Sequence, residues 1–140
     1  MKKIIFLLLL FSSCTTEPQP IVAGKDECHF CKMTVADSRF ATELITDKGK
    51  VFKFDDVICM SKFIKAGKVD ENKMSRILLM DFSDNSLIDA ETAFILESNE
   101  LHSPMGGNAA AFLLKDEAHN MQKEKGGEIM DWKTLFNKLN

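Results

Sequence analysis

One order of strand-forming and helix-forming segments occurs twice along the chain, and this repeat restricts the fold more than any single motif. In the first half, RFATELIT (39–46) and VFKFDD (51–56) alternate in polarity and predict a β-hairpin. VICMSKFIKAG (57–67) then predicts a helix, with Asp55 or Asp56 as its expected cap and Gly67 as its expected end, and with Val57, Met60 and Ile64 on its expected buried face. The apolar run RILLMDF (76–82) predicts a buried strand. The first half is therefore expected to be strand, strand, helix, strand.

The second half follows a similar order. AETAFILES (90–98) predicts a strand, and NELHSPMGGN (99–108) predicts a segment that is partly extended and partly a turn. AAAFLLKDEAHNMQKEKGG (109–127) predicts a helix, EIMDW (128–132) a closing strand, and KTLFNKLN (133–140) a short amphipathic tail.

The helix predicted over 109–127 has Asn108 as its expected cap and Gly126 as its expected end. Its expected buried stripe is Ala111, Leu114, Ala118 and Met121. We expect an α+β fold of two tandem strand–strand–helix–strand units, at 25–83 and 84–140. Each unit is too small to bury a good core alone, so the two are expected to pack as one domain over 25–140.

The N-terminus has the three parts of a bacterial secretory signal, in MKKIIFLLLLFSSC. The Ser12-Ser13 pair directly before Cys14 resembles a lipobox, so we expect a signal peptide over 1–13 and an acyl lipid, such as palmitate, on Cys14. Residues 14–24 then predict a flexible tether. The chain is expected to be a lipoprotein held on the inner or outer membrane of the bacterial cell envelope, facing the periplasm.

Charge and motifs exclude several classes of function. The chain has 18 Lys and Arg against 21 Asp and Glu, a formal net charge of −3, with no basic stripe for nucleic acid. It contains no nucleophile elbow, phosphate-binding loop, dinucleotide fingerprint or metalloprotease motif. We therefore expect no catalytic residues and no enzyme activity.

The stretch CHFCKM, with Cys28, His29, Cys31 and Met33, is compatible with three kinds of site. A zinc site would need a second pair of Cys or His ligands, which the sequence does not supply as a second C-x-x-C. A thiol–disulfide couple would use Cys28 and Cys31. A soft-metal site would use Cys31 and Met33, whose side chains project to the same side of an extended segment.

Other parts of the chain could complete a soft-metal site. LHSPMGGN places Met105 in a glycine-rich loop with His102 nearby, and both are candidate ligands. Cys59 is interpreted first as a packed thiol and second as an auxiliary ligand. His29 is an ambiguous neighbour of the site.

The leader, DECHFCKMTVAD, RFATELIT…GKVFKFDDVICM and SPMGGNAAAF together resemble the NosL family of copper-binding lipoproteins, which are accessory to nitrous oxide reductase assembly. The resemblance covers nearly all of the expected mature chain. It implies the NosL and organomercurial-lyase-like fold, although a shared fold does not imply shared chemistry.

The resemblance also implies a metallochaperone that holds one Cu(I) outside the cytoplasmic membrane. Its implied partners are apo nitrous oxide reductase or its membrane assembly transporter. By position, Cys31 and Met33 match the family's C-x-M motif and Met105 matches its loop methionine, with His102 as a nearby candidate. Cys28 has no place in that motif. The alternatives are a thiol–disulfide redox lipoprotein that uses Cys28 and Cys31, and an interaction lipoprotein with structural cysteines.

Overall fold

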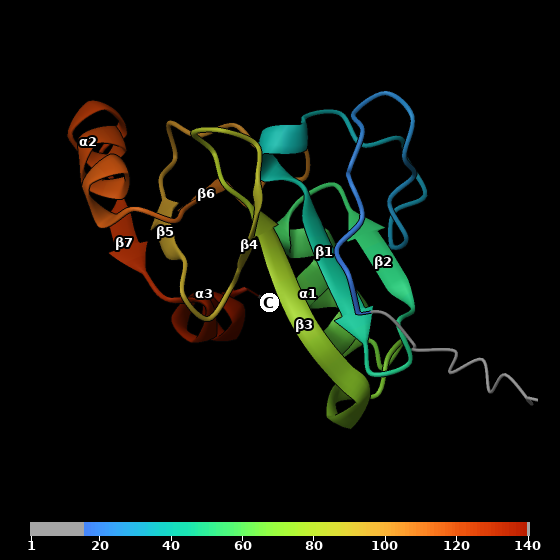
Figure 1. Cartoon of the computed structure of the whole chain (residues 1–140). Coiled ribbons are helices and arrows are strands. Elements are labelled where there is room, and N and C mark those ends of the chain that lie inside the picture. The colour runs from blue at the N-terminus through green and yellow to red at the C-terminus, as the bar shows by residue number, and fades with distance from the viewer. Residues whose placement is uncertain (1–15, 140) are drawn as a thin grey trace, which may run out of the picture.

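The structure is a computed structural model that describes residues 16–139, so the expected signal peptide and the lipid on Cys14 lie outside the described residues. Figure 1 shows the arrangement of the elements. In chain order they are η1 (Ser38–Phe40), β1 (Thr42–Thr46), β2 (Val51–Phe54), α1 (Val57–Lys65), η2 (Glu71–Lys73), β3 (Met74–Met80), β4 (Leu87–Asp89), β5 (Phe94–Glu97), β6 (Ala109–Phe112), α2 (Lys115–Lys125), β7 (Glu128–Met130) and α3 (Trp132–Lys138).

The first sheet is four-stranded and antiparallel, in the order β2-β1-β3-β4. It includes β4, which lies within 84–140, so the first unit extends to Asp89 and past the expected boundary at 83. The predicted hairpin is confirmed as β1 and β2, and β1 is the fully buried strand between β2 and β3. The predicted helix is confirmed as α1, capped by Asp56. Its predicted core residues, Val57, Met60 and Ile64, are all buried.

The second unit forms a three-stranded antiparallel sheet in the order β6-β5-β7. In both units the first strand in sequence lies between the second and the third. The repeat predicted from the order of elements is therefore confirmed as a repeat of topology, and the α+β fold class is confirmed with it. β4 was not predicted, because a three-residue strand is too short for a periodic pattern.

The helix predicted over 109–127 is wrong in its first part, because Ala109–Phe112 is the strand β6. All four residues are buried, with Ala109 and Ala111 in the core between the two sheets and Ala110 and Phe112 in the core under α2. A strand covered on both faces by packed elements needs a continuous apolar run, which three alanines and Phe112 supply here, and this tertiary packing overrides the helical propensity of alanine.

The start of the following helix is also corrected. α2 begins at Lys115, with Leu114 at the cap position and without a side-chain cap. Asn108 adopts a φ of 46° and does not cap a helix. Of the predicted stripe, Ala118 is buried but Leu114 is 56% exposed. Gly126 ends the helix as predicted, with its N–H bonded to the carbonyl of Gln122.

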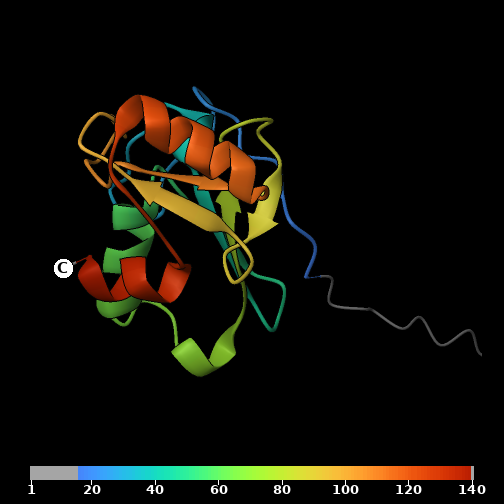
Figure 2. The same ribbon diagram turned by 90° about the vertical axis from the view of Figure 1, so that its left-hand side faces the viewer.

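The two units share one hydrophobic core, to which α1 contributes from one face of the first sheet (Figures 1 and 2). α3 lies beside the C-terminal end of α1, where Lys65 Nζ donates to the carbonyl of Phe136 at 3.1 Å. This core contains residues from the first sheet, α1, the second sheet and α3, among them Leu44, Phe54, Met60, Ile95, Met130 and Leu135. The sheets also touch through the backbone, where the N–H of Phe82 donates to the carbonyl of Ala111 at 2.8 Å. The chain therefore folds as one body.

The N-terminal segment covers the face of the first sheet opposite α1 (Figure 1). Ile21 is buried, and the N–H of Gln19 donates to the Glu43 carboxylate at 3.0 Å. Lys53 Nζ donates to the carbonyl of Pro20 at 2.6 Å. Packing against the sheet thus begins at about Gln19, within the segment 14–24 that was expected to be a tether.

No helix within residues 16–139 combines the length and the apolar character that a membrane-crossing helix needs.

Candidate metal centre

The CHFCKM stretch folds into a tight turn. Glu27 and Thr34 form an isolated β-bridge, and inside it the N–H of Cys28 donates to the carbonyl of Met33 at 2.8 Å. Lys32 adopts a φ of 66° and donates its N–H to the carbonyl of Cys28 at 3.0 Å. The expectation that Cys31 and Met33 lie in an extended segment is therefore wrong, because the left-handed residue between them reverses the chain.

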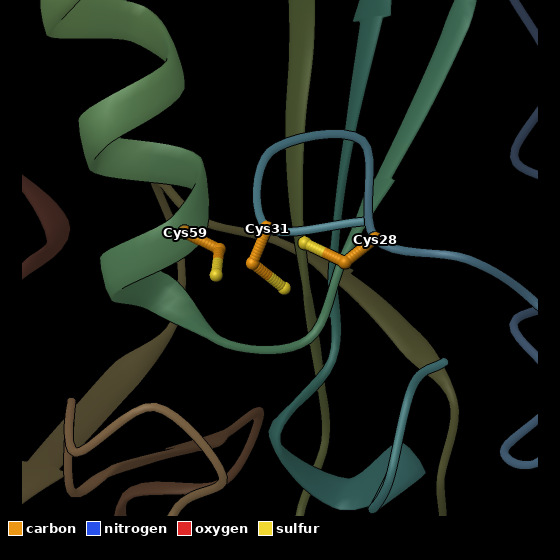
Figure 3. Close-up of side chains that lie close together, drawn as sticks. All are labelled: Cys28, Cys31 and Cys59. Atoms are coloured by element: carbon orange, nitrogen blue, oxygen red, sulfur yellow. The ribbon is translucent and has the colours of Figure 1, made fainter. Parts of the chain in front are cut away.

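The turn brings Cys31 next to Cys28, and α1 brings Cys59 to the same place (Figure 3). Cys59 is the third residue of α1, and its N–H donates to Asp56 Oδ1 at 3.2 Å. The three Sγ atoms lie within 4.8 Å of one another, and all three cysteines are free thiols. Cys28 and Cys59 are buried and Cys31 is half-buried, so the cluster meets solvent on the side of Cys31.

Hydrogen bonds between the thiols distribute their protons unequally. The Cys59 thiol donates to Cys28, and this bond, with help from backbone N–H groups, lowers the pKa of Cys28 to about 5 despite its burial. The same bond raises the pKa of Cys59, and burial raises the pKa of Cys31. In the metal-free cluster Cys28 is therefore the thiolate, and it accepts a hydrogen bond from the protonated Cys59. Cys31 is the second protonated thiol.

We expect a titration of the apo-protein, followed by the ultraviolet absorbance of thiolate, to show one step near pH 5, against an ordinary thiol value of 9.0. The thiol of the unfolded chain keeps its proton up to that ordinary value. The ionised Cys28 thiol therefore adds its full contribution to the free energy of unfolding above pH 9, and this contribution is lost as the pH falls through about 5.

In Cys28→Ser the low step should disappear, and in Cys59→Ala it should move to higher pH. Three thiols that titrate together near the ordinary thiol value of 9.0 would contradict this arrangement.

The histidines do not join the sulfur cluster. Among residues 16–139, only the three cysteines form a group of three or more Cys, His, Asp or Glu side chains that are close enough together to hold a metal ion. His29 Nδ1 accepts a hydrogen bond from the N–H of Lys53 at 3.0 Å, and its ring packs edge-on against Phe52. This bond occupies one ring nitrogen of His29. His102 is exposed.

The two candidate methionines have different surroundings. Met33 is 50% exposed and lies after the turn, where its carbonyl accepts from the N–H of Cys28. Met105 is partly buried and packs against the core group that contains Cys28 and Cys59. Its N–H donates to Asp56 Oδ2 at 3.2 Å, so the loop that carries it is attached to the first turn of α1.

Cys59 is the site residue to which sequence reasoning gave too little weight, because it was interpreted first as a packed thiol. The signal that could have found it is its spacing from Asp56. A capping aspartate three residues earlier predicts that the cysteine lies in the first turn of a helix, and in the structure that end of α1 lies beside the CHFCKM turn.

Three sulfur ligands on two elements suit a soft metal ion that accepts a low coordination number. Structural zinc takes four ligands, and the cysteines provide three. Thiol–disulfide exchange needs a thiolate that a partner disulfide can reach. Here the thiol with the lowered pKa, Cys28, is fully buried, while the accessible thiol, Cys31, has a raised pKa. The geometry therefore favours metal binding over redox exchange.

Comparisons with known proteins agree with this fold. The family model described as NosL matches residues 20–139. A crystal structure of the copper chaperone NosL from Shewanella denitrificans is similar to this chain, with a TM-score of 0.65 and 21% identity, over 85% of this chain and 95% of that one. No curated protein matches the sequence significantly. The match to a solved structure at this identity supports the fold.

Proposed function

This chain belongs to the NosL family, and on that premise we propose that it is a copper metallochaperone. It binds one Cu(I) ion outside the cytoplasmic membrane and passes the ion to a copper protein. The observation that carries the proposal is the convergence of three free cysteine sulfurs, within 4.8 Å of one another, from a turn and a helix. Thiolates are soft ligands that select Cu(I) over magnesium or calcium.

In this proposal Cys28, Cys31 and Cys59 hold the ion, and Met105 completes the sulfur set. Met33 is half exposed after the turn, and its proposed role is to contact copper as the ion enters or leaves. His102 and His29, the candidate nitrogen ligands from the sequence, are not part of this all-sulfur set.

Transfer requires a site that a partner's ligand can enter before the donor's ligands leave. Cys31 is half-buried beside two buried thiols, so an incoming thiolate or imidazole would approach on its side of the cluster. The protein thus acts as a carrier, and no step of the transfer requires catalysis by its residues.

The proposed location is the periplasmic side of the bacterial cell envelope, with the lipid on Cys14 holding the domain on the inner or outer membrane. The proposed recipient is apo nitrous oxide reductase or its membrane assembly transporter. Both proposals rest on the leader sequence and on the family.

The test is an anaerobic titration of the reduced protein against a coloured Cu(I) chelator. We expect one Cu(I) bound per chain, with an affinity well above that of a weak chelator, and release of the ion when the apo-reductase is added. In parallel, the apo-protein should react slowly with a small disulfide, because its low-pKa thiol is buried.

The redox alternative makes the opposite prediction for this pair of assays. It requires fast exchange with the disulfide, abolished in Cys28→Ser, and no retention of Cu(I) by the reduced protein. That combination of results would overturn the proposed function.

A further inference from the structure

Asp56 makes hydrogen bonds in two directions at the boundary between the two units. Its Oδ1 accepts from the backbone N–H groups of Ile58 and Cys59, at 2.9 and 3.2 Å, as a helix cap does. Its Oδ2 accepts from the hydroxyl of Ser103 at 2.7 Å, and from the N–H groups of Met105 and Gly107 at 3.2 and 3.1 Å. One carboxylate therefore binds the cysteine-bearing helix on one side and the methionine-bearing loop on the other.

The second set of bonds exceeds what capping requires. Asp56 is 1% exposed, and none of the ion pairs within residues 16–139 includes it. A buried carboxylate without a cation must be compensated by hydrogen bonds, and here the loop supplies three of the five donors. The loop is thus shaped to enclose this carboxylate.

The loop is also braced internally and packed closely against α1. The N–H of Asn108 donates to Ser103 Oγ at 2.8 Å, and Asn108 Oδ1 accepts from the N–H of Ser103 at 3.2 Å. A Cβ atom added at Gly107 would lie 2.7 Å from Val57 Cγ2 and 3.1 Å from Asp56 Oδ2. A braced loop in such contact moves as a unit, so its anchor at Asp56 determines where Met105 lies relative to Cys59.

We propose that Asp56 is the positioning residue of the copper site, which holds the Ser103–Gly107 loop on the first turn of α1 and so places the Met105 sulfur beside the three cysteines. This inference rests on the proposed function, because it assigns Asp56 a role toward the same Cu(I) ion. Groups that orient metal ligands from outside the coordination shell affect metal affinity through those ligands. Asp56 would orient one ligand from each unit, Cys59 from the first and Met105 from the second.

Asp56→Asn separates the two sets of bonds. Asparagine caps helices as well as aspartate does, but its single acceptor oxygen can serve only one set of donors. With that oxygen kept at α1, the amide nitrogen would face the N–H groups of the loop and release it. We expect Cu(I) affinity, measured by chelator competition, to fall by about 10- to 100-fold.

The decisive readout is a double-mutant cycle with Met105→Leu. Met105→Leu should weaken Cu(I) binding in the wild type and have little further effect in Asp56→Asn, because the loop is already displaced. Ser103→Ala, which removes one loop bond and leaves the cap, should show a smaller change in the same direction. Asp131→Asn changes the cap of α3 and should leave copper affinity unchanged.

A purely structural role would lower thermal stability and leave Cu(I) affinity unchanged in both Asp56→Asn and Ser103→Ala. That result would overturn the inference, as would a Met105→Leu effect of equal size in both backgrounds, or no such effect in the wild type. In all these cases the wild type would still bind Cu(I), so the proposed function would stand. Failure of the wild type to bind Cu(I) would overturn both.

Discussion

Cys59→Ala is expected to weaken Cu(I) binding by at least about 100-fold, or about 2.7 kcal/mol. The sulfur of Cys59 lies within 4.8 Å of the sulfurs of Cys28 and Cys31, and it comes from a different element. Removing it leaves two thiols on one short turn. The affinity is measured under anaerobic conditions by competition with a chelator that forms a coloured Cu(I) complex.

The matched control is Ser61→Ala, two residues further along the same helix. Ser61 is buried and its hydroxyl makes no hydrogen bond to any residue in the described range 16–139, so this change should leave copper affinity at the wild-type value. A site built only from Cys31 and Met33 predicts the reverse pattern. In that case Cys59→Ala would bind copper normally and Met33→Leu would not, and the three-cysteine site would be rejected.

Ile95→Ala is expected to reduce the free energy of unfolding of the whole domain by about 3 to 4 kcal/mol. Ile95 is 1% exposed on the central strand of the second sheet, and it packs into the core shared with α1 and the first sheet. Truncation of such a side chain loses apolar burial and leaves a cavity between the units. Because the core is shared, both units should lose stability together.

Chemical denaturation can check this with two probes, the fluorescence of Trp132 in α3 and circular dichroism of the whole chain. We expect one transition, shifted equally for both probes. Leu113→Ala is the control, because Leu113 is half exposed and should change stability by no more than about 0.5 kcal/mol. Two separate transitions, with only one shifted by Ile95→Ala, would show that the units fold independently.

The fold was predictable where local pattern and tertiary packing agree. Alternation in 39–46 and 51–56 identified the first hairpin, and the capping aspartate and Gly67 bounded α1 correctly. The pattern failed at Ala109–Phe112, where alanine indicates a helix by propensity. That segment is a strand because α2 covers one of its faces and the shared core the other, and most residues of the shared core come from distant parts of the chain.

The site was predictable only in part, for a related reason. The CHFCKM motif named Cys31 as a candidate and Cys28 as a less certain one, and the structure places both in the cysteine cluster. Met105, from the glycine-rich loop, stays a prediction. Placing Cys59 among them required knowing that α1 begins directly under the turn, which local sequence does not encode. The expected pairing of Cys31 with Met33 assumed extended backbone, and the positive φ of Lys32 removes that geometry.

The central claim is that sulfur atoms from both the turn and α1 form one Cu(I) site. X-ray absorption spectroscopy at the copper edge, on reduced protein loaded with a single equivalent of Cu(I), tests it most directly. We expect a first shell of sulfur only, with three or four neighbours, that loses one sulfur in Cys59→Ala. A shell that contains nitrogen or oxygen, or one that is unchanged in Cys59→Ala, would contradict it.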